Sequence, residues 1–150
     1  MEMNLVILCI GNKYGGDDGI GPYIAKKLIN KTKGDCYIID SGTNPENYTS
    51  LIKKLNPKLL IILDAVEMGL KPGNIRIIDK SKIGVMHISS HNIPISLLIS
   101  YLEKYLKKII FIGIQSKRMS GNLSEECKKS SNILIKNILN NNFENIDIFE

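Results

Sequence analysis

The chain has 150 residues, of which 43% are hydrophobic, and both values are typical of one globular domain with a buried core, predicted to span residues 1–150. The formal net charge of +5 comes with lysines scattered over predicted helices and loops, a pattern expected of solvated helix faces. Aromatic residues make up only 6% of the chain and Trp is absent, so no nucleic-acid partner is expected.

The first half of the sequence alternates short apolar runs with segments of helical periodicity. Residues 4–10 are almost entirely apolar and are followed by Gly11, which predicts a buried strand. A glycine-rich loop then leads into a predicted helix over residues 19–30, with Pro22 in its first turn. The other predicted elements of this half are a strand over residues 35–40, a short helix over 46–55 and a strand over 58–64.

The second half continues the alternation after a turn-rich stretch around Pro72 and Gly73. Its last helix is predicted to begin after Ser124, which can cap the helix, and its first turn is acidic. The tail after Asn140 is rich in asparagine and is expected to be only partly ordered. The predicted elements here are a strand over residues 75–79, a helix over 92–107 with Pro94 in its first turn, a strand over 109–114 and a helix over 125–140.

Strands that alternate with helices predict an α/β fold, with a mostly parallel sheet covered by helices on both faces. Ligands of such sheets gather beyond the carboxyl ends of the strands, where the strand order reverses. We therefore expect Asp18, in the loop after the first strand, to lie near Asp64, which ends the strand over residues 58–64. His91 joins them if its loop crosses the same edge of the sheet.

The glycine-rich loop carries two consecutive carboxylates, Asp17 and Asp18. The dinucleotide-binding pattern Gly-x-Gly-x-x-Gly and the Lys-Ser/Thr ending of a phosphate-binding loop are both absent after the first strand. Negative charge at this place disfavours a pyrophosphate and favours a cation or a hydrogen-bond donor. The structural alternative is that one of the two aspartates caps the following helix. A nucleotide-binding α/β protein stays open as an alternative function.

Asp64 follows five apolar residues, and a carboxylate at the end of a central strand is costly unless it is paired, hydrogen-bonded or metal-bound. The alternative is that it caps the next turn, and Asp40 occupies a comparable place. His91 precedes a predicted helix whose dipole disfavours imidazolium, and neutral imidazole is the form that binds metals. It can equally be a polar loop residue, and His87 is the weaker histidine candidate. Asp18, Asp64 and His91 together would form a three-ligand site with open positions.

The three cysteines are Cys9, Cys36 and Cys127, and no two of them form a Cys-x-x-Cys pair. An odd number of cysteines argues against a disulfide framework and fits a reducing compartment. The sequence starts without the features of a signal peptide, and no apolar run approaches the roughly 20 residues that span a membrane. We therefore expect a cytoplasmic protein that is not inserted into a membrane.

A set of short motifs, distributed over most of the chain, is similar to that of the nickel-iron hydrogenase maturation endopeptidases. The region from Pro45 to Asn47 and the region from Asp64 to Asp79 are especially similar to the hydrogenase 3 type, which serves membrane-associated, hydrogen-evolving enzymes. The shared motifs are Gly11-Asn12, Gly16-Asp17-Asp18-Gly19-Ile20-Gly21-Pro22, Asp40-Ser41-Gly42-Thr43, Leu63-Asp64-Ala65, Pro72-Gly73, Ser90-His91 and Phe111-Ile112-Gly113-Ile114-Gln115.

The resemblance implies a three-layer α/β/α sandwich around a twisted, mostly parallel central sheet. It also implies an endopeptidase that removes the C-terminal extension of a nickel-loaded NiFe-hydrogenase large-subunit precursor. The metal-contacting and catalytic residues of the family fall on Asp18, Asp64 and His91, and some members carry Glu at the place of Asp18. We expect the nickel to be supplied by the precursor rather than held tightly by the free enzyme, and we expect the enzyme to be a monomer.

The same residues allow two alternatives. A non-catalytic, nickel-dependent binding module or chaperone for the same precursor would share every ligand and lack only turnover. Asp17 could serve as a second acid or base instead of a cap. The chain also departs from many relatives after Gln115, where it has Ser116 in place of Pro, and this loop is a candidate for contact with the substrate.

Overall fold

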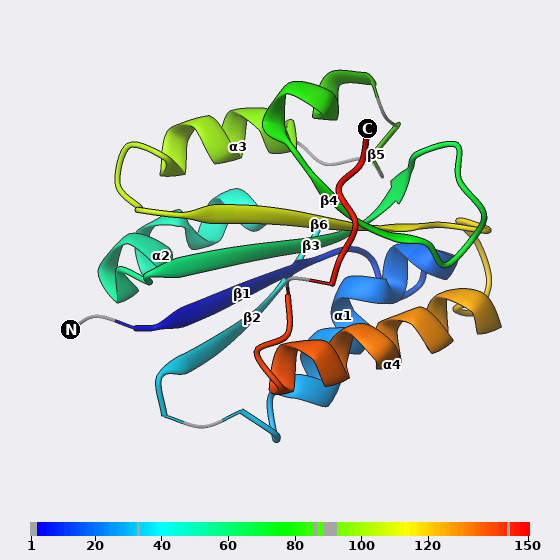
Figure 1. Ribbon diagram of the computed structural model, residues 1–150, viewed down its shortest axis with the longest axis horizontal. Helices are drawn as coiled ribbons and strands as arrows, with labels where there is room; N and C mark the ends of the chain where they lie inside the picture. Colours follow the sequence, from blue (N-terminus) through cyan, green and yellow to red (C-terminus); the bar gives the residue numbers. More distant parts are fainter. Residues whose placement is uncertain (1–2, 33, 86, 89–92, 144) are drawn as a thin grey trace.

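The computed structural model describes residues 3–32, 34–85, 87–88, 93–143 and 145–150. Within these ranges the chain forms an α/β structure around one mixed sheet (Figure 1). No helix in the described ranges is long and apolar enough to cross a membrane. The strands are β1 (Leu5–Ile10), β2 (Cys36–Gly42), β3 (Leu59–Glu67), β4 (Ile75–Ile78), β5 (His87–Ile88) and β6 (Ile109–Gln115).

The sheet follows the order β2-β1-β3-β6-β4, and β5 pairs with the end of β3. Pairing is parallel among β2, β1, β3 and β6, whereas β4 runs antiparallel to β6 and β5 antiparallel to β3. The four parallel strands need crossover connections, and the helices provide them. The predicted mostly parallel sheet is therefore confirmed.

Helices cover both faces of this sheet, which gives the three layers seen in Figure 1. α1 (Ile20–Leu28) and α4 (Glu125–Leu139) contact each other on one face, and α2 (Thr49–Leu55) and α3 (Ile95–Leu102) lie over the other. Three short 3₁₀ helices complete the described elements: η1 (Gly16–Gly19), η2 (Pro45–Tyr48) and η3 (Lys80–Val85).

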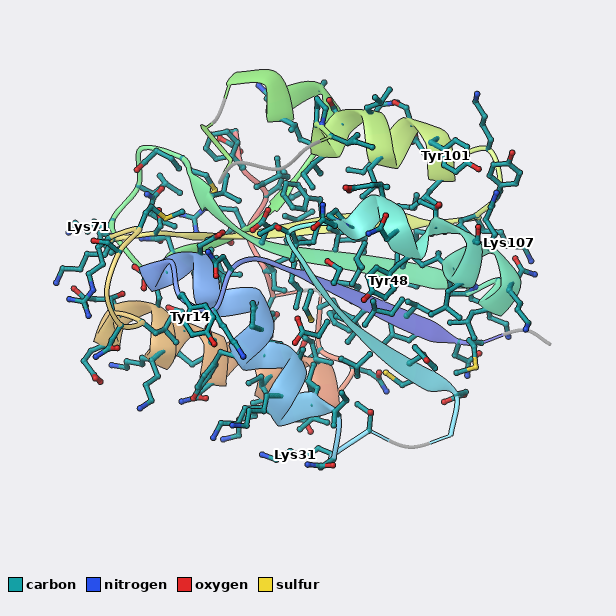
Figure 2. The ribbon with its side chains drawn as sticks, turned by 180° about the vertical axis from the view of Figure 1, so that it is seen from behind. Tyr14, Lys31, Tyr48, Lys71, Tyr101 and Lys107 are labelled. Atoms are coloured by element: carbon teal, nitrogen blue, oxygen red, sulfur yellow. The ribbon has the colours of Figure 1, made fainter. Side chains whose placement is uncertain are left out.

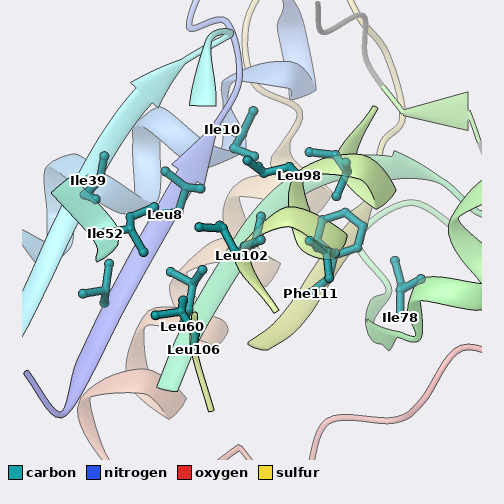
Figure 3. Close-up of a cluster of buried hydrophobic side chains, with 14 of the residues drawn as sticks. Leu8, Ile10, Ile39, Ile52, Leu60, Ile78, Leu98, Leu102, Leu106 and Phe111 are labelled. Atoms are coloured by element: carbon teal, nitrogen blue, oxygen red, sulfur yellow. The ribbon is translucent and has the colours of Figure 1, made fainter. Parts of the chain in front are cut away.

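Alternate residues of the central strands supply two separate hydrophobic cores, because successive side chains of a strand point to opposite faces. Leu8 and Leu60 pack with Leu102 and Phe111 under α2 and α3, as Figure 3 shows. Ile7 and Ile61 belong to the other core, under α1 and α4. The near-continuous apolar runs of β1 and β3 follow from this burial on both faces.

Several boundaries differ from the sequence-based expectation, most clearly those of β3 and α3. β3 continues for three residues beyond Asp64, to Glu67, because β5 and β6 extend its pairing there. α3 covers only Ile95–Leu102, and Pro94 is its N-cap residue rather than part of the first turn. Buried Leu102 and Leu106 are then joined by a turn, so their apolar spacing continues where the α-helix does not.

The C-terminal tail is also better ordered than expected. Ile148 forms a parallel bridge with Ile77 in β4, with hydrogen bonds of 2.8 Å from Ile77 N to Asp147 O and from Phe149 N to Ile77 O. Ile146 is buried against the core under α1 and α4. The tail thus covers the open edge of the sheet, which the asparagine-rich composition before it did not indicate.

Candidate functional site

The strand order reverses between β1 and β3, and Asp18 and Asp64 belong to the segments on either side of this point. α1 connects β1 to β2 on one face of the sheet, and α2 leads from β2 to β3 on the other. Cys9 in β1 is the register partner of Leu63, which places Asp64 one residue further along, level with the end of β1. η1, which contains Asp18, packs against β3. Both aspartates therefore lie at the carboxyl edge where ligands of such sheets bind.

The backbone around Asp18 approaches so closely that the preceding turn requires glycine. Gly11 has a φ of +145°, and a Cβ atom there would lie 1.9 Å from the carbonyl oxygen of Asp18. Asp18 itself is 7% exposed, and its Oδ2 accepts a hydrogen bond of 3.0 Å from Asn12 N. Its Oδ1 is buried and has no hydrogen-bond partner within the part of the chain that the structure describes. Such an oxygen costs stability unless a ligand occupies it, so it is a candidate donor atom.

Asp17 has the opposite surroundings, because its carboxylate is saturated with donors. Oδ1 accepts from Ser124 N (2.7 Å), and Oδ2 accepts from Lys117 N (2.7 Å), Arg118 N (3.1 Å) and Ser124 Oγ (2.9 Å). Burial alone would raise the pKa of Asp17, but these hydrogen bonds outweigh burial and hold the pKa below its ordinary value. Neither aspartate caps α1, which begins after Gly19 without a side-chain cap. Asp17 instead fastens η1 to the segment that precedes α4.

Asp64 is almost completely buried, with 1% exposure, and its Oδ1 accepts a hydrogen bond of 2.8 Å from Ala65 N. It lies inside β3, so capping of a following turn is excluded. By strand alternation its side chain shares the face of Leu60 and Ile62, which is the face under α2 and α3. Asp40, the competing carboxylate, alternates with Ile39 on β2, so it points to the opposite face and is exposed.

His91 lies outside the described residues, and so its relation to the two aspartates is not described. His87, the weaker candidate, pairs with Glu67 in the ladder between β5 and β3. Within the described ranges, no three His, Cys, Asp or Glu side chains form a group that could hold a metal ion. Of the three expected site residues, the structure therefore describes two, Asp18 and Asp64.

An open pocket of about 580 Å³ adjoins the Asp18 loop. It lies between the loops that follow β1 and β2, at the same edge of the sheet, and Tyr14 and Tyr48 of its lining can be located in Figure 2. This volume is in the range of small-molecule and peptide-side-chain sites. The lining consists of Gly11, Asn12, Lys13, Tyr14, Pro22, Asp40, Ser41, Gly42, Thr43 and Tyr48.

Gln115 is a structural contributor to which the sequence interpretation assigned no role. It ends β6, is 2% exposed, and its Oε1 accepts hydrogen bonds from Met68 N (2.7 Å) and Leu70 N (3.2 Å). Its Nε2 donates to Glu67 Oε2 at 2.8 Å. Gln115 therefore fixes the turn that follows β3. A polar amide at the end of an apolar strand was the signal that could have identified it.

All three cysteines carry free thiols, as the odd number suggested. Cys9 lies in β1 next to the candidate site, but its side chain is fully buried in the core under α1 and α4. Burial strongly raises the pKa of its thiol, so Cys9 stays protonated and is not available as a thiolate ligand.

Comparisons with known proteins agree on one family. The family model described as "Hydrogenase maturation protease" matches residues 22–141. The hydrogenase 3 maturation protease of Escherichia coli K12 is 46% identical over 114 residues, which is 75% of this chain and 73% of that protein. The solution structure of an Escherichia coli endopeptidase superimposes with a TM-score of 0.90 at 35% identity, covering 99% of this chain and 97% of the other. A NiFe hydrogenase maturation protease from Thermococcus kodakarensis KOD1 superimposes with a TM-score of 0.84 at 29% identity, covering 93% and 92%.

Proposed function

The chain belongs to the hydrogenase maturation protease family, and from this premise we propose that it removes the C-terminal extension of a NiFe-hydrogenase large-subunit precursor once nickel has been inserted. We propose that Asp18, Asp64 and His91 recognise the nickel of the precursor by coordinating it, and that they take part in cleavage of the peptide bond beside it. The observation that carries this proposal is the buried, unpartnered Oδ1 of Asp18 at the strand-order reversal next to β3.

The inclusion of His91 rests on the motif that it shares with the family, because His91 lies outside the described residues. The described strand before it is β5, whose residue Ile88 is the register partner of Val66. Their pairing is antiparallel, so β5 runs along β3 in the direction of Asp64.

The donor set explains why nickel should arrive with the precursor. Two carboxylates and one imidazole, without a thiolate, hold a borderline metal ion only loosely. Nickel that is already bound by cysteine thiolates of the precursor has open positions that these three side chains can complete. The free protein is then expected to bind nickel weakly and to ignore a precursor without nickel.

The chemistry required of the protein is modest. Nickel at the site can polarise the scissile carbonyl or serve only as the recognition element, and both roles are compatible with the same ligands. A carboxylate of Asp18 or Asp64 can take the proton of the attacking water, and Oδ1 of Asp18 has no hydrogen-bond partner among the described residues. The pocket beside Asp18 offers space for the precursor segment next to the cleaved bond.

A processing assay followed by intact-mass measurement tests the proposal. The wild-type protein should remove the extension from nickel-loaded precursor and leave nickel-free precursor intact. Asp64→Asn should lower kcat on the order of a hundredfold or more, because an amide neither accepts a proton nor supplies a charged ligand. Asp79→Asn is the matched control, since Asp79 is an exposed carboxylate with a local partner, Ser81. Binding of the loaded precursor without any loss of mass would contradict the proposal and favour a non-catalytic binding module.

A further inference from the structure

Two loops that are far apart in the sequence form one surface beside the candidate site. Residues 12–16 follow β1, and residues 116–122 follow β6; together we call them the loop platform. Gly15 forms a parallel bridge with Gly121, and Gly16 N donates to Gly121 O at 3.1 Å. The platform is continuous with the site, because residue 16 begins the 3₁₀ helix that contains Asp18, and Lys13 and Tyr14 also line the adjoining pocket.

The loop platform is rigid for its size. Asp17 N donates to Arg118 O at 2.8 Å, and the Asp17 carboxylate accepts from the three backbone N–H groups and the hydroxyl described above. Gly16 has a φ of +62°, and a Cβ atom there would come within 2.6 Å of Ser120 N. A surface that is fixed before binding loses little conformational entropy when a partner docks.

Two large side chains on the loop platform are exposed to solvent. Tyr14 is 78% exposed and Met119 is 46% exposed, although both are large apolar side chains. Exposed cations belong to the same two loops: the Nζ atom of Lys13 lies 5.1 Å from the Tyr14 ring centre, and the side chain of Arg118 donates through Nε to Asn122 O. Lys117 differs from these two, because it is paired with Glu126 at 2.7 Å.

We propose that the loop platform is the docking surface for the folded body of the precursor, with Tyr14 and Met119 as apolar anchors. The facing surface of the precursor would be apolar with acidic side chains at its margin, opposite Lys13 and Arg118. A second copy of this chain is the weaker occupant, because it would bring two basic platforms and a net charge of +5 on each copy together. This inference rests on the proposed function and adds how the substrate is recognised away from the cleaved bond.

Steady-state processing of nickel-loaded precursor tests the apolar anchors. Tyr14→Ser combined with Met119→Ser should raise KM about tenfold, as loss of interface anchors does, and should leave kcat within about twofold. The matched control combines Tyr37→Ser with Leu139→Ser. These residues are 41% and 40% exposed, and they lie near the start of β2 and at the end of α4. The control should leave both KM and kcat unchanged.

The cationic residues of the loop platform, Lys13 and Arg118, are tested separately. Arg118→Glu should raise KM and flatten the dependence of KM on ionic strength, because the acidic face of the precursor would then meet a negative charge. Lys31→Glu, an equal charge change at an exposed residue beyond the end of α1, should do neither. An unchanged KM for the double anchor variant, or a loss confined to kcat, would overturn the docking inference while leaving the proposed function intact. A wild-type protein that does not cleave nickel-loaded precursor would overturn both.

Discussion

Asp17 and Asp18 are neighbours in the chain, but their carboxylates differ in how many hydrogen bonds they accept. Asp17 is fully buried and receives four hydrogen bonds, whereas Asp18 receives one and keeps a buried oxygen without a partner. The donors to Asp17 come from residues about one hundred positions later in the chain. A saturated carboxylate stabilises the fold, and an unsatisfied one is kept at the expense of stability, as is common at functional sites.

Substitution of Asp18 separates its charge from its shape. Asp18→Asn should lower kcat for nickel-loaded precursor on the order of a hundredfold, because the charged oxygen donor is lost. The Tm of this variant should stay the same or rise, since a buried charged carboxylate with one unpartnered oxygen is replaced by a neutral amide. Asp18→Glu should keep most of the activity, because the longer side chain still delivers a carboxylate. Processing rate and thermal unfolding measured on the same samples check both expectations, and an active Asp18→Asn protein would remove Asp18 from the site.

At the scale of elements, Asp17 joins η1, the segment before α4 and α4 itself. Ser124 donates its hydroxyl to Asp17 and accepts from Cys127 N at 3.3 Å, which makes it the N-cap of α4 as the sequence indicated. One carboxylate thus fixes the start of a fifteen-residue helix against the loop that carries Asp18. α4 also packs against α1, so this contact lies between the candidate site and that helical layer.

The Asp17 contacts predict a pH-dependent contribution to stability. Asp17→Asn should lower the free energy of unfolding at pH 7 by about 2–4 kcal/mol, because the amide cannot accept from four donors in one buried place. The pKa of Asp17 in the folded state lies below its ordinary value of 3.8. The stabilisation is therefore complete above pH 3.8 and is lost as the pH falls through the lower, folded-state pKa. The difference in the free energy of unfolding between the wild-type protein and Asp17→Asn should therefore be smaller in acid. Urea unfolding at pH 7 and pH 3 measures this difference.

Asp79 provides the comparison for this experiment. Hydrogen bonds from Ser81 also lower the pKa of Asp79, but its side chain is exposed and solvent screens the interaction. Asp79→Asn should leave the urea midpoint nearly unchanged at both pH values. If the free energies of unfolding of the wild type and Asp17→Asn differed by the same amount at both pH values, the charge of Asp17 would not be what holds these elements together.

Most elements could be predicted from the sequence, because apolar runs and helical periodicity report burial directly. Two of the deviations, in β3 and in the tail, occur where a distant segment decides the outcome. β3 is longer than its apolar run because β5 pairs with its last two residues, and the tail is ordered by its bridge to Ile77. Both are contacts between segments remote in sequence, which local patterns do not contain.

At the scale of the whole molecule, the topology explains which part of the candidate site could be predicted. Parallel pairing of β1 with β3 brings the Asp18 segment and Asp64 to one edge, and the alternation of strands and helices was sufficient to expect this. Strand position alone did not separate Asp64 from Asp40 in the sequence; the resemblance favoured Asp64, and in the structure the two side chains point to opposite faces of the sheet. The loop platform depends on a bridge between Gly15 and Gly121, which no sequence pattern indicated.

The central claim is that Asp18, Asp64 and His91 face one metal ion at the edge of the sheet. A crystal structure of the protein soaked with a nickel salt, with anomalous data collected at the nickel edge, tests it most directly. We expect a single nickel peak about 2 Å from a carboxylate oxygen of Asp18, a carboxylate oxygen of Asp64 and a ring nitrogen of His91. Side chains of these three residues that point to separate regions, too far apart to contact a common ion, would contradict the account.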